Sequence, residues 1–328
     1  MKALVTGATG FIGSHLVEAL LRQGIEVRCI VRRQSNRRWL VGKPVEIVEA
    51  SLTAPETLPP AVKGVDIVCH VAGVIAARSA AEFMRGNRDA TVNLLQAVLR
   101  YAPSLQRFVF LSSLAAVGPA RSLAEPVTET SPCQPITAYG KSKKAAEEAV
   151  LAAADRLPVT VIRPPAVYGP RDAATLPFFR AVRLGIAPLI GFQEKYLSLV
   201  YVEDLVRGIL QAAASERAVG QVYFISSEEY YTWGQLTEAA RVALGRRYVW
   251  RIRVPHAFIL GVASIAEVAG WIMRRPPVFD LEKGWDMIQP YWICQPTKAA
   301  VELGYRQTVG LVEGMRKTVE WYREHGWL

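Results

Sequence analysis

The sequence predicts an α/β protein in which a doubly wound parallel sheet is followed by a smaller, mostly helical substrate domain. Three observations predict this fold. Apolar runs of strand length alternate with amphipathic helical segments through the first half of the chain. A glycine-rich turn at residues 7–13 joins the first apolar run to the first helical segment. After Arg163, prolines break the regular alternation.

Short apolar runs in the first half of the chain predict six strands, with helices between them. Strands separated by crossover helices form a parallel sheet that is covered by helices on both faces. The fifth and sixth runs are almost entirely apolar, which is typical of central parallel strands. The predicted strands are 2–6, 25–31, 45–49, 65–70, 107–112 and 159–163, and the helices lie near 12–23, 82–101 and 137–155.

The second half of the chain predicts one return to the sheet and then a separate lid. Residues 221–225 read as a further strand and residues 201–210 as a helix packed beside it. The remainder, 226–328, is predicted to be mostly helical. We therefore expect a first domain of residues 1–169, to which 196–225 return, and a substrate-binding lid of residues 170–195 and 226–328.

Composition excludes several classes of protein. With 51% hydrophobic residues among 328, the chain has ample material for a packed core. Four cysteines and four histidines lie far apart without ligand spacing, so we expect reduced thiols, a cytoplasmic protein and no metal site. The 39 basic against 29 acidic side chains give a charge of +10, yet no nucleic-acid-binding motif accompanies it. An anionic cofactor and an anionic or membrane-borne substrate explain the charge better than nucleic acid does.

The turn after the first strand predicts a dinucleotide site. Gly7 permits a tight exit from the strand, Gly10 lets the backbone approach the phosphates, and Gly13 allows close packing of helix and strand. The N–H groups that open the helix point at the pyrophosphate, and the helix dipole favours its charge. The alternative is a glycine-rich turn without a ligand. The predicted contacts are Gly7, Thr9, Gly10, Phe11 and Ile12.

The end of the second strand distinguishes between the two nicotinamide dinucleotides. An NAD site usually carries an acidic residue there to bind the ribose hydroxyls. This strand ends instead in Arg32 and Arg33, and Glu26 comes too early. Two guanidinium groups can bind a 2′-phosphate by charge-assisted hydrogen bonds. NADP(H) is therefore favoured over NAD(H), the alternative being a solvated basic face such as Arg37 and Arg38 form.

Tyr139 and Lys143 are predicted to be an acid–base pair for a carbonyl or an alcohol. Four residues apart on a helix, their side chains lie on one face. A free tyrosine has a pKa of about 10 and exchanges protons poorly at neutral pH. A nearby ammonium and the positive ring of an oxidised nicotinamide are expected to lower that pKa. The alternative is an ordinary pair of surface residues.

Over nearly its whole length the chain resembles the extended short-chain dehydrogenase/reductase family, which is built on the Rossmann sheet. It is most similar to the branch with dihydroflavonol-reductase-like, 3β-hydroxysteroid-dehydrogenase-like and sugar-epimerase-like members. The resemblance is specific for fold and cofactor and much less so for substrate. It rests on residues 6–13 (TGATGFIG), 64–66 (GVD), 70–73 (HVAG), Asn87, Ser112-Ser113 ahead of Gly118, the Tyr139/Lys143 pair, 163–170, 200–204 (VYVED), 302–305 (ELGY) and 321–323.

The resemblance implies further site residues and a partner. Ser113 would donate a hydrogen bond to the substrate oxygen, in preference to Ser112. The family often has Asp where Ser51 lies, which weakens the expected contact to the adenine. Members commonly form homodimers through two helices, here 82–101 and 137–155. The other implied cofactor contacts are Ser51 and Leu52 at the adenine, Val71, Ala72 and Gly73 at the phosphates and ribose, and Pro165 and Val167 at the nicotinamide carboxamide.

Three activities are compatible with these residues. They are an NADP(H)-dependent reductase or dehydrogenase acting on a hydrophobic small molecule, a nucleotide-sugar epimerase or dehydratase with retained cofactor, and a regulatory NADP-binding protein without turnover. Sugar-nucleotide members carry a diphosphate-binding Arg where this chain has residues 195–200, although Arg171 and Arg180 remain possible phosphate contacts. The apolar segment 257–273 predicts a helix over the substrate pocket, with peripheral docking on an anionic membrane as the alternative.

Overall fold

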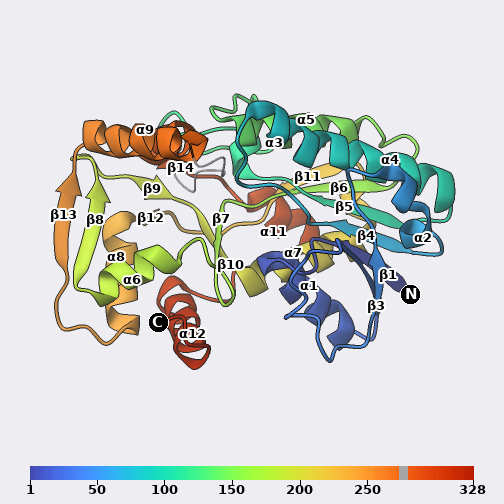
Figure 1. Cartoon of the computed structure of the whole chain (residues 1–328), viewed down its shortest axis with the longest axis horizontal. Helices are drawn as coiled ribbons and strands as arrows, with labels where there is room; N and C mark the ends of the chain where they lie inside the picture. The colour runs from blue at the N-terminus through green and yellow to red at the C-terminus, as the bar shows by residue number, and fades with distance from the viewer. Residues whose placement is uncertain (273–279) are drawn as a thin grey trace.

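A parallel sheet of seven strands forms the core of one half of the molecule, on the right in Figure 1. The computed structural model describes residues 1–272 and 280–328. The strand order is β11-β6-β5-β4-β1-β2-β3, and each neighbouring pair is parallel. The doubly wound prediction is therefore confirmed, with strand ends shifted by at most two residues. The strands are β1 Lys2–Thr6, β2 Glu26–Val31, β3 Val45–Glu49, β4 Ile67–His70, β5 Arg107–Leu111, β6 Val159–Arg163 and β11 Gln221–Phe224.

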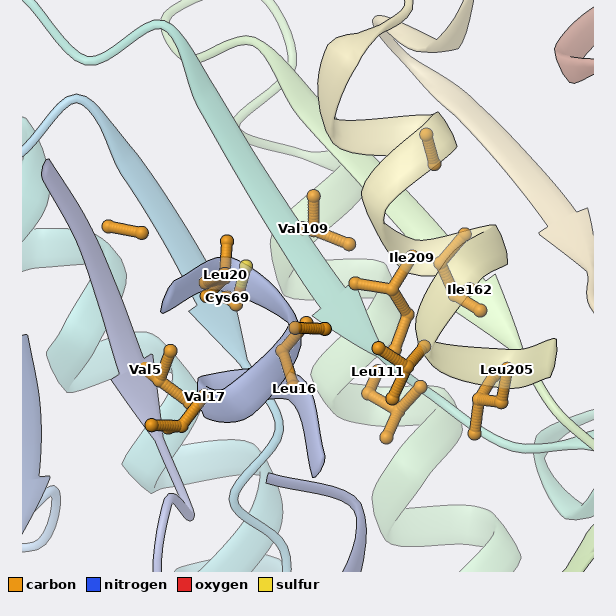
Figure 2. Close-up of a cluster of buried hydrophobic side chains, with 14 of the residues drawn as sticks. Val5, Leu16, Val17, Leu20, Cys69, Val109, Leu111, Ile162, Leu205 and Ile209 are labelled. Carbon is orange, nitrogen blue, oxygen red and sulfur yellow. The ribbon is translucent and has the colours of Figure 1, made fainter. Parts of the chain in front are cut away.

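Helices cover both faces of this sheet (Figure 1). On one face α1 (Phe11–Arg22), α7 (Val202–Ala214) and α11 (Thr297–Leu303) pack on the strands. Figure 2 shows Leu16 and Leu20 of α1 and Leu205 and Ile209 of α7 meeting side chains of β1, β4, β5 and β6. The other face is covered by α2 (Pro59–Val62), α4 (Ala90–Tyr101) and α5 (Ala138–Leu151).

The helix predicted over 82–101 is interrupted. It consists of α3 (Ala80–Met84) and α4, joined by a π-helical turn over Arg85–Asp89. Such turns are frequent at functional sites because the extra residue redirects a side chain. Here the turn contains Asn87, which is almost completely buried beneath the site described below.

The lid end of the molecule contains more strand than its sequence predicts. The five-residue strand β13 alternates Arg with apolar residues and pairs with β8, more than sixty residues earlier. Such pairing is decided by tertiary contacts that local sequence does not show. Helices α6 (Leu176–Arg183), α8 (Trp233–Ala243) and α12 (Leu311–Glu324) enclose a separate core. The strands outside the central sheet are β7 Ala166–Tyr168, β8 Ile186–Ile190, β9 Tyr196–Leu197, β10 Leu199–Tyr201, β12 Tyr231–Thr232, β13 Trp250–Val254 and β14 Tyr291–Trp292.

The segment predicted at 257–273 forms most of α9 (His256–Ile272), which is followed by α10 (Leu281–Ile288). Met273 and the flanking Arg274 and Arg275 lie outside the described residues. Within the two described ranges, no helix has both the length and the apolar character required to cross a bilayer.

Candidate active site

The glycine-rich turn packs so closely that Gly7 and Gly13 have no room for a Cβ atom. Gly7 has a φ of +71°, and a Cβ added to it would lie 2.8 Å from the backbone nitrogen of Ala72. A Cβ at Gly13 would overlap the carbonyl oxygen of Gly7. Helix α1 begins at Phe11 with Gly10 as its N-cap, a residue that has no side chain to bind the first N–H groups. The turn is thus a backbone cradle at the positive end of a helix.

The turn after β4 is joined to the glycine turn by a chain of buried hydrogen bonds. The hydroxyl of Thr6 accepts the N–H of Ala72 at 3.1 Å and lies 2.7 Å from Nδ1 of His70. Nε2 of His70 lies 2.9 Å from the hydroxyl of Thr91, which donates to the carbonyl of Asn87 at 2.7 Å. Burial and the nearby Lys143 lower the pKa of His70 to about 3, so the imidazole is neutral. The neutral side chain of His70 therefore links the two turns through hydrogen bonds at both ring nitrogens.

Asn87 fixes the same turn from the other side. Its Oδ1 accepts the N–H of Val74 at 2.7 Å, and its Nδ2 donates to the Val74 carbonyl at 3.0 Å and to the Ser142 hydroxyl at 2.8 Å. A Cβ at Gly73 would lie 3.3 Å from Oδ1 of Asn87 and 3.7 Å from Nζ of Lys143. Residues 71–73 are therefore held directly beside the helix that carries Tyr139 and Lys143. The sequence signal for Asn87 was its place in the family resemblance, which gave it no role.

Helix α5 carries the predicted acid–base pair. It begins at Ala138 because the hydroxyl of Thr137 accepts the N–H of Gly140 at 3.0 Å. Lys143 is buried one turn into the helix, and its Nζ donates to the carbonyl of Leu111 at 2.6 Å, at the end of β5. Burial lowers the pKa of Lys143 to about 7. A central strand end and a helix N-terminus thus place a weakly basic amine beside residues 71–73.

Tyr139 and Ser113 meet at the mouth of the site. Burial raises the pKa of the Tyr139 phenol, a hydrogen bond with Ser113 lowers it, and the charge of Asp286 raises it again. The sequence predicted a lowered pKa, because it assumed that Lys143 and the nicotinamide ring act on the phenol. In the chain itself Lys143 donates to Leu111 instead. Ser112, one residue earlier, has a buried hydroxyl without a hydrogen-bond partner among the described residues.

At the far end of the cradle, Arg32 and Arg33 border an open cavity of about 480 Å³. Both arginines are exposed, and Ser51 lines the same cavity. The carbonyl of Leu52 accepts a hydrogen bond from Nδ2 of Asn93 at 2.9 Å, which fixes the loop after β3. The cavity therefore brings two cations to the position that follows β2.

The segment after β6 lies next to the Ser113 turn. The carbonyl of Pro164 accepts the N–H of Leu114 at 2.8 Å. Val167 then lies in β7, half-buried, and pairs with Val200 of β10. Pro165, in the link between these contacts, is thereby held near the end of β5. Apart from their backbone, these residues offer only apolar side chains to the site.

The helix α10 closes the site from the lid, and sequence reasoning missed it. Oε2 of Glu282 accepts the N–H of Ala138 at 2.6 Å, at the first residue of α5. One turn later, Asp286 is close enough to raise the pKa of Tyr139. The Nζ of Lys195 donates to the carbonyls of Ile288 and Gln289 and so caps the other end of α10. The ion pair between Asp286 and Lys283 measures 2.6 Å.

Comparisons with known proteins agree with this geometry. The model of the NAD-dependent epimerase/dehydratase family matches residues 3–238. The chain is 33% identical over 326 residues to a ceramide reductase of Caulobacter vibrioides, covering 99% of this chain and 95% of the relative. It is 32% identical over 232 residues to a 4-hydroxy-2-methyl-3-oxo-4-farnesyl-3,4-dihydroquinoline-1-oxide ketoreductase of Stigmatella aurantiaca, covering 69% and 68% of the two chains. A dTDP-glucose 4,6-dehydratase of Streptomyces venezuelae, solved with NAD bound, superposes with a TM-score of 0.78 at 26% identity, covering 100% of this chain and 98% of its own.

Proposed function

The chain belongs to the NAD-dependent epimerase/dehydratase family and is an NAD(P)-dependent oxidoreductase of the extended short-chain dehydrogenase/reductase type, and from that premise we propose its reaction. It reduces a ketone of a hydrophobic small molecule, or oxidises the matching secondary alcohol, with NADP(H) as cofactor. Tyr139 is the acid–base residue, Ser113 binds the substrate oxygen, and Lys143 binds the cofactor ribose.

One observation carries this proposal above the others. The amine of Lys143 would lie 3.7 Å from a Cβ at Gly73, and the next residue back, Ala72, touches Gly7 of the glycine turn. The cradle and the acid–base helix are therefore parts of one continuous site. Strand β1, strand β4 and helix α5 meet there at the carboxyl ends of the sheet, where the strand order reverses. Ligands of doubly wound folds bind at that position.

The protein residues fit a dinucleotide phosphate. The backbone of Gly7, Thr9, Gly10, Phe11 and Ile12 would hold its pyrophosphate, because glycines leave the N–H groups accessible. Arg32 and Arg33 would bind the 2′-phosphate in the cavity beside Ser51 and Leu52. Val71, Ala72 and Gly73 would line the ribose. The backbone around Pro165 and Val167 would meet the carboxamide.

The chain's own groups favour reduction. A bound nicotinamide supplies hydride transfer to the carbonyl carbon. Ser113 donates a hydrogen bond to the carbonyl oxygen, and this bond strengthens as negative charge develops there. Because burial raises the pKa of Tyr139, the phenol is protonated at neutral pH and can deliver its proton to the new alkoxide. Lys143, an amine of pKa about 7, binds the cofactor ribose and so positions the nicotinamide beside the carbonyl carbon.

The internal contacts of three cationic side chains near the lid favour an apolar substrate over a sugar diphosphate. In the run 195–200, Lys195 is already engaged with the carbonyls that end α10. Arg171 pairs with Glu18 at 2.6 Å, and Arg180 donates to the carbonyl of Trp327 at 3.2 Å. These three side chains therefore serve internal contacts that a sugar diphosphate would have to replace. The names of two reductase relatives support the same substrate class, since one names ceramide and the other a farnesyl-bearing ketone.

Retained NAD(P) with sugar epimerisation or dehydration is the alternative, and the likeness to the dTDP-glucose dehydratase favours it. The experiment measures oxidation of NADPH and of NADH by the purified protein with a panel of long-chain ketones, beside Tyr139→Phe as control. We expect NADPH consumption with an apolar ketone and a loss of kcat of about 10²- to 10⁴-fold in the variant. Cofactor that co-purifies and is not consumed would instead favour the epimerase. Cofactor binding without any turnover would favour a regulatory protein.

Two further expectations belong to this proposal. The chain forms a homodimer through α4 and α5, because family members commonly pair through these helices. It works in the cytoplasm, in keeping with four free cysteines, of which Cys29, Cys69 and Cys294 are buried. We assign residues 1–169 and 196–225 to the cofactor domain and the rest to the substrate lid. Size measurement in solution tests the first expectation.

A further inference from the structure

Helix α9 has two different faces. Its inner face packs on α10, where a Cβ at Gly284 would lie 3.2 Å from both Cβ of Ala263 and Cδ2 of Leu260. On its outer face Phe258, Val262 and Ile265 are 63%, 41% and 73% exposed. At about 3.6 residues per turn, these three positions lie on the side opposite Leu260 and Ala263. The helix thus covers α10 with one stripe and presents a second apolar stripe to the outside.

Further exposed apolar side chains lie on the strand that leads into α9. Strand β13 runs into the helix at the end of the molecule farthest from β3 (Figure 1). Its Trp250 and Ile252 are 68% and 48% exposed, whereas Arg251 between them turns toward Glu238 of α8 at 3.6 Å. Phe192, which is also exposed, is attached to β13 because its carbonyl accepts a hydrogen bond from Arg253. We name this set the docking surface: Phe192, Trp250, Ile252, Phe258, Val262 and Ile265.

The two segments that form the docking surface are strongly basic. Residues 173–193 and 239–266 contain seven arginines and no aspartate or glutamate. Arg241 and Arg251 pair with Glu238 from the neighbouring helix. Six of the seven arginines are exposed, and Arg241 is half-buried. The arginines are Arg180, Arg183, Arg241, Arg246, Arg247, Arg251 and Arg253.

We propose that the docking surface binds the surface of an anionic phospholipid bilayer. Exposed aromatic and aliphatic side chains insert at the boundary between headgroups and acyl chains, and surrounding arginines attract anionic headgroups. A second copy of the chain fits this surface less well. In a twofold interface the same patch meets itself, so arginines would face arginines. Anionic lipid supplies the opposite charge.

Docking has a consequence for the active site, and this consequence rests on the proposed function. Because α9 packs on α10, the bilayer would hold the helix that bears Glu282 and Asp286. Docking itself requires neither cofactor nor turnover.

The test is sedimentation of the full chain with vesicles, in the absence of cofactor and substrate. One set of vesicles is phosphatidylcholine alone, and in the other phosphatidylglycerol replaces part of it. We expect binding to the anionic set that weakens as salt is added. The double variant Phe258→Ser/Ile265→Ser should lower the partition coefficient by about tenfold or more, because it removes inserted apolar area. The charge variant Arg246→Gln/Arg247→Gln should weaken binding to anionic vesicles specifically.

A matched control replaces exposed apolar residues elsewhere. Val301 of α11 and Val312 of α12 are 74% and 58% exposed, and Val301→Ser/Val312→Ser should bind vesicles like the parent. Thermal melting establishes that every variant is folded before vesicles are added. Absence of binding to either vesicle set, or equal losses in test and control variants, overturns the proposal. A dimer in light scattering that only Phe258→Ser/Ile265→Ser dissociates also overturns it and assigns the surface to a second copy.

Discussion

Two regions lie against the catalytic helix α5, and they are built differently. The turn at residues 71–73 belongs to a cradle of backbone atoms, in which glycines occur where a Cβ would collide. Helix α10 reaches the same helix through side chains, with Glu282 on the N–H of Ala138 and Asp286 near Tyr139. A Cβ at Gly7 or Gly13 would collide with backbone atoms, whereas the contacts of α10 depend on the side chains that it carries. This difference explains why the sequence predicts a dinucleotide-binding turn and does not predict the substrate.

The sharpest test of the comparison is the same substitution in each region. Gly13→Ala places a Cβ onto the carbonyl oxygen of Gly7, and the backbone can make room only at a high energetic cost. We therefore expect the free energy of unfolding to fall by about 2 to 4 kcal/mol. Dinucleotide binding should be lost as well. Gly261→Ala, in α9, meets no atom within 4 Å and should stabilise the protein by about 0.5 to 1 kcal/mol. Urea unfolding with and without NADPH measures both. Equal effects of the two substitutions would remove the distinction between the regions.

Lys143 of α5, which lies beside the cradle, should show a conflict between function and stability. Burial lowers its pKa from 10.5 to about 7. Between these values the unfolded chain binds a proton that the folded chain does not, so stability rises with pH there and the buried ammonium is most unfavourable below pH 7. We expect Lys143→Met to raise stability at pH 6 by about 1 kcal/mol or more, while kcat falls at least about 100-fold.

The pH dependence of the parent enzyme follows from the same group. In the free enzyme, kcat/KM should fall as pH rises through about 7, because the ammonium of Lys143 loses its proton. Lys141→Met is the matched control, since this lysine of α5 is exposed. It should change neither the melting temperature at pH 6 nor kcat appreciably. A lower melting temperature for Lys143→Met at pH 6 would show that burial of this amine is not unfavourable.

Substitution of the two arginines that follow β2 should have a smaller effect on cofactor binding, because their side chains are exposed. Arg32→Ala/Arg33→Ala removes charge-assisted hydrogen bonds to a 2′-phosphate and should weaken NADPH binding by about 10- to 100-fold. NADH binding should change little. Arg38→Ala is the control, because that guanidinium is stacked on Trp39 at 4.3 Å. Fluorescence titration with both dinucleotides checks this, and an equal loss for NADH would contradict the proposed preference.

The smallest effect is expected at the contact between lid and helix. Glu282→Ala leaves the first N–H of α5 without its carboxylate and should destabilise the closed lid by about 1 kcal/mol. KM for the ketone should therefore rise more than kcat falls. Glu282→Gln keeps an acceptor and should recover most of the loss. If both variants lower kcat alone, Glu282 acts on the chemistry of Tyr139 and not on the lid.

Much of the fold and half of the candidate site could be predicted from local patterns. The glycines at 7, 10 and 13 and the spacing of Tyr139 and Lys143 each lie within one turn or one helix. Their geometry is set by bonds and helical periodicity, so adjacent residues suffice to describe it. The interruption of the helix at 82–101 was not predicted, since a π-helical turn follows from the contacts of Asn87 with Val74 and Ser142.

The sequence by itself determined the parallel sheet, and it predicted the glycine-rich turn and the spacing of Tyr139 and Lys143, because each follows from residues that are neighbours along the chain. Only the tertiary structure decided that Glu282 caps α5, 144 positions earlier in the chain. It also decided that Lys195 binds the carbonyl groups at the end of α10 and that the buried His70 is neutral. These are contacts between distant segments, and burial sets their charges. Sequence spacing carries no information about either until the chain has packed.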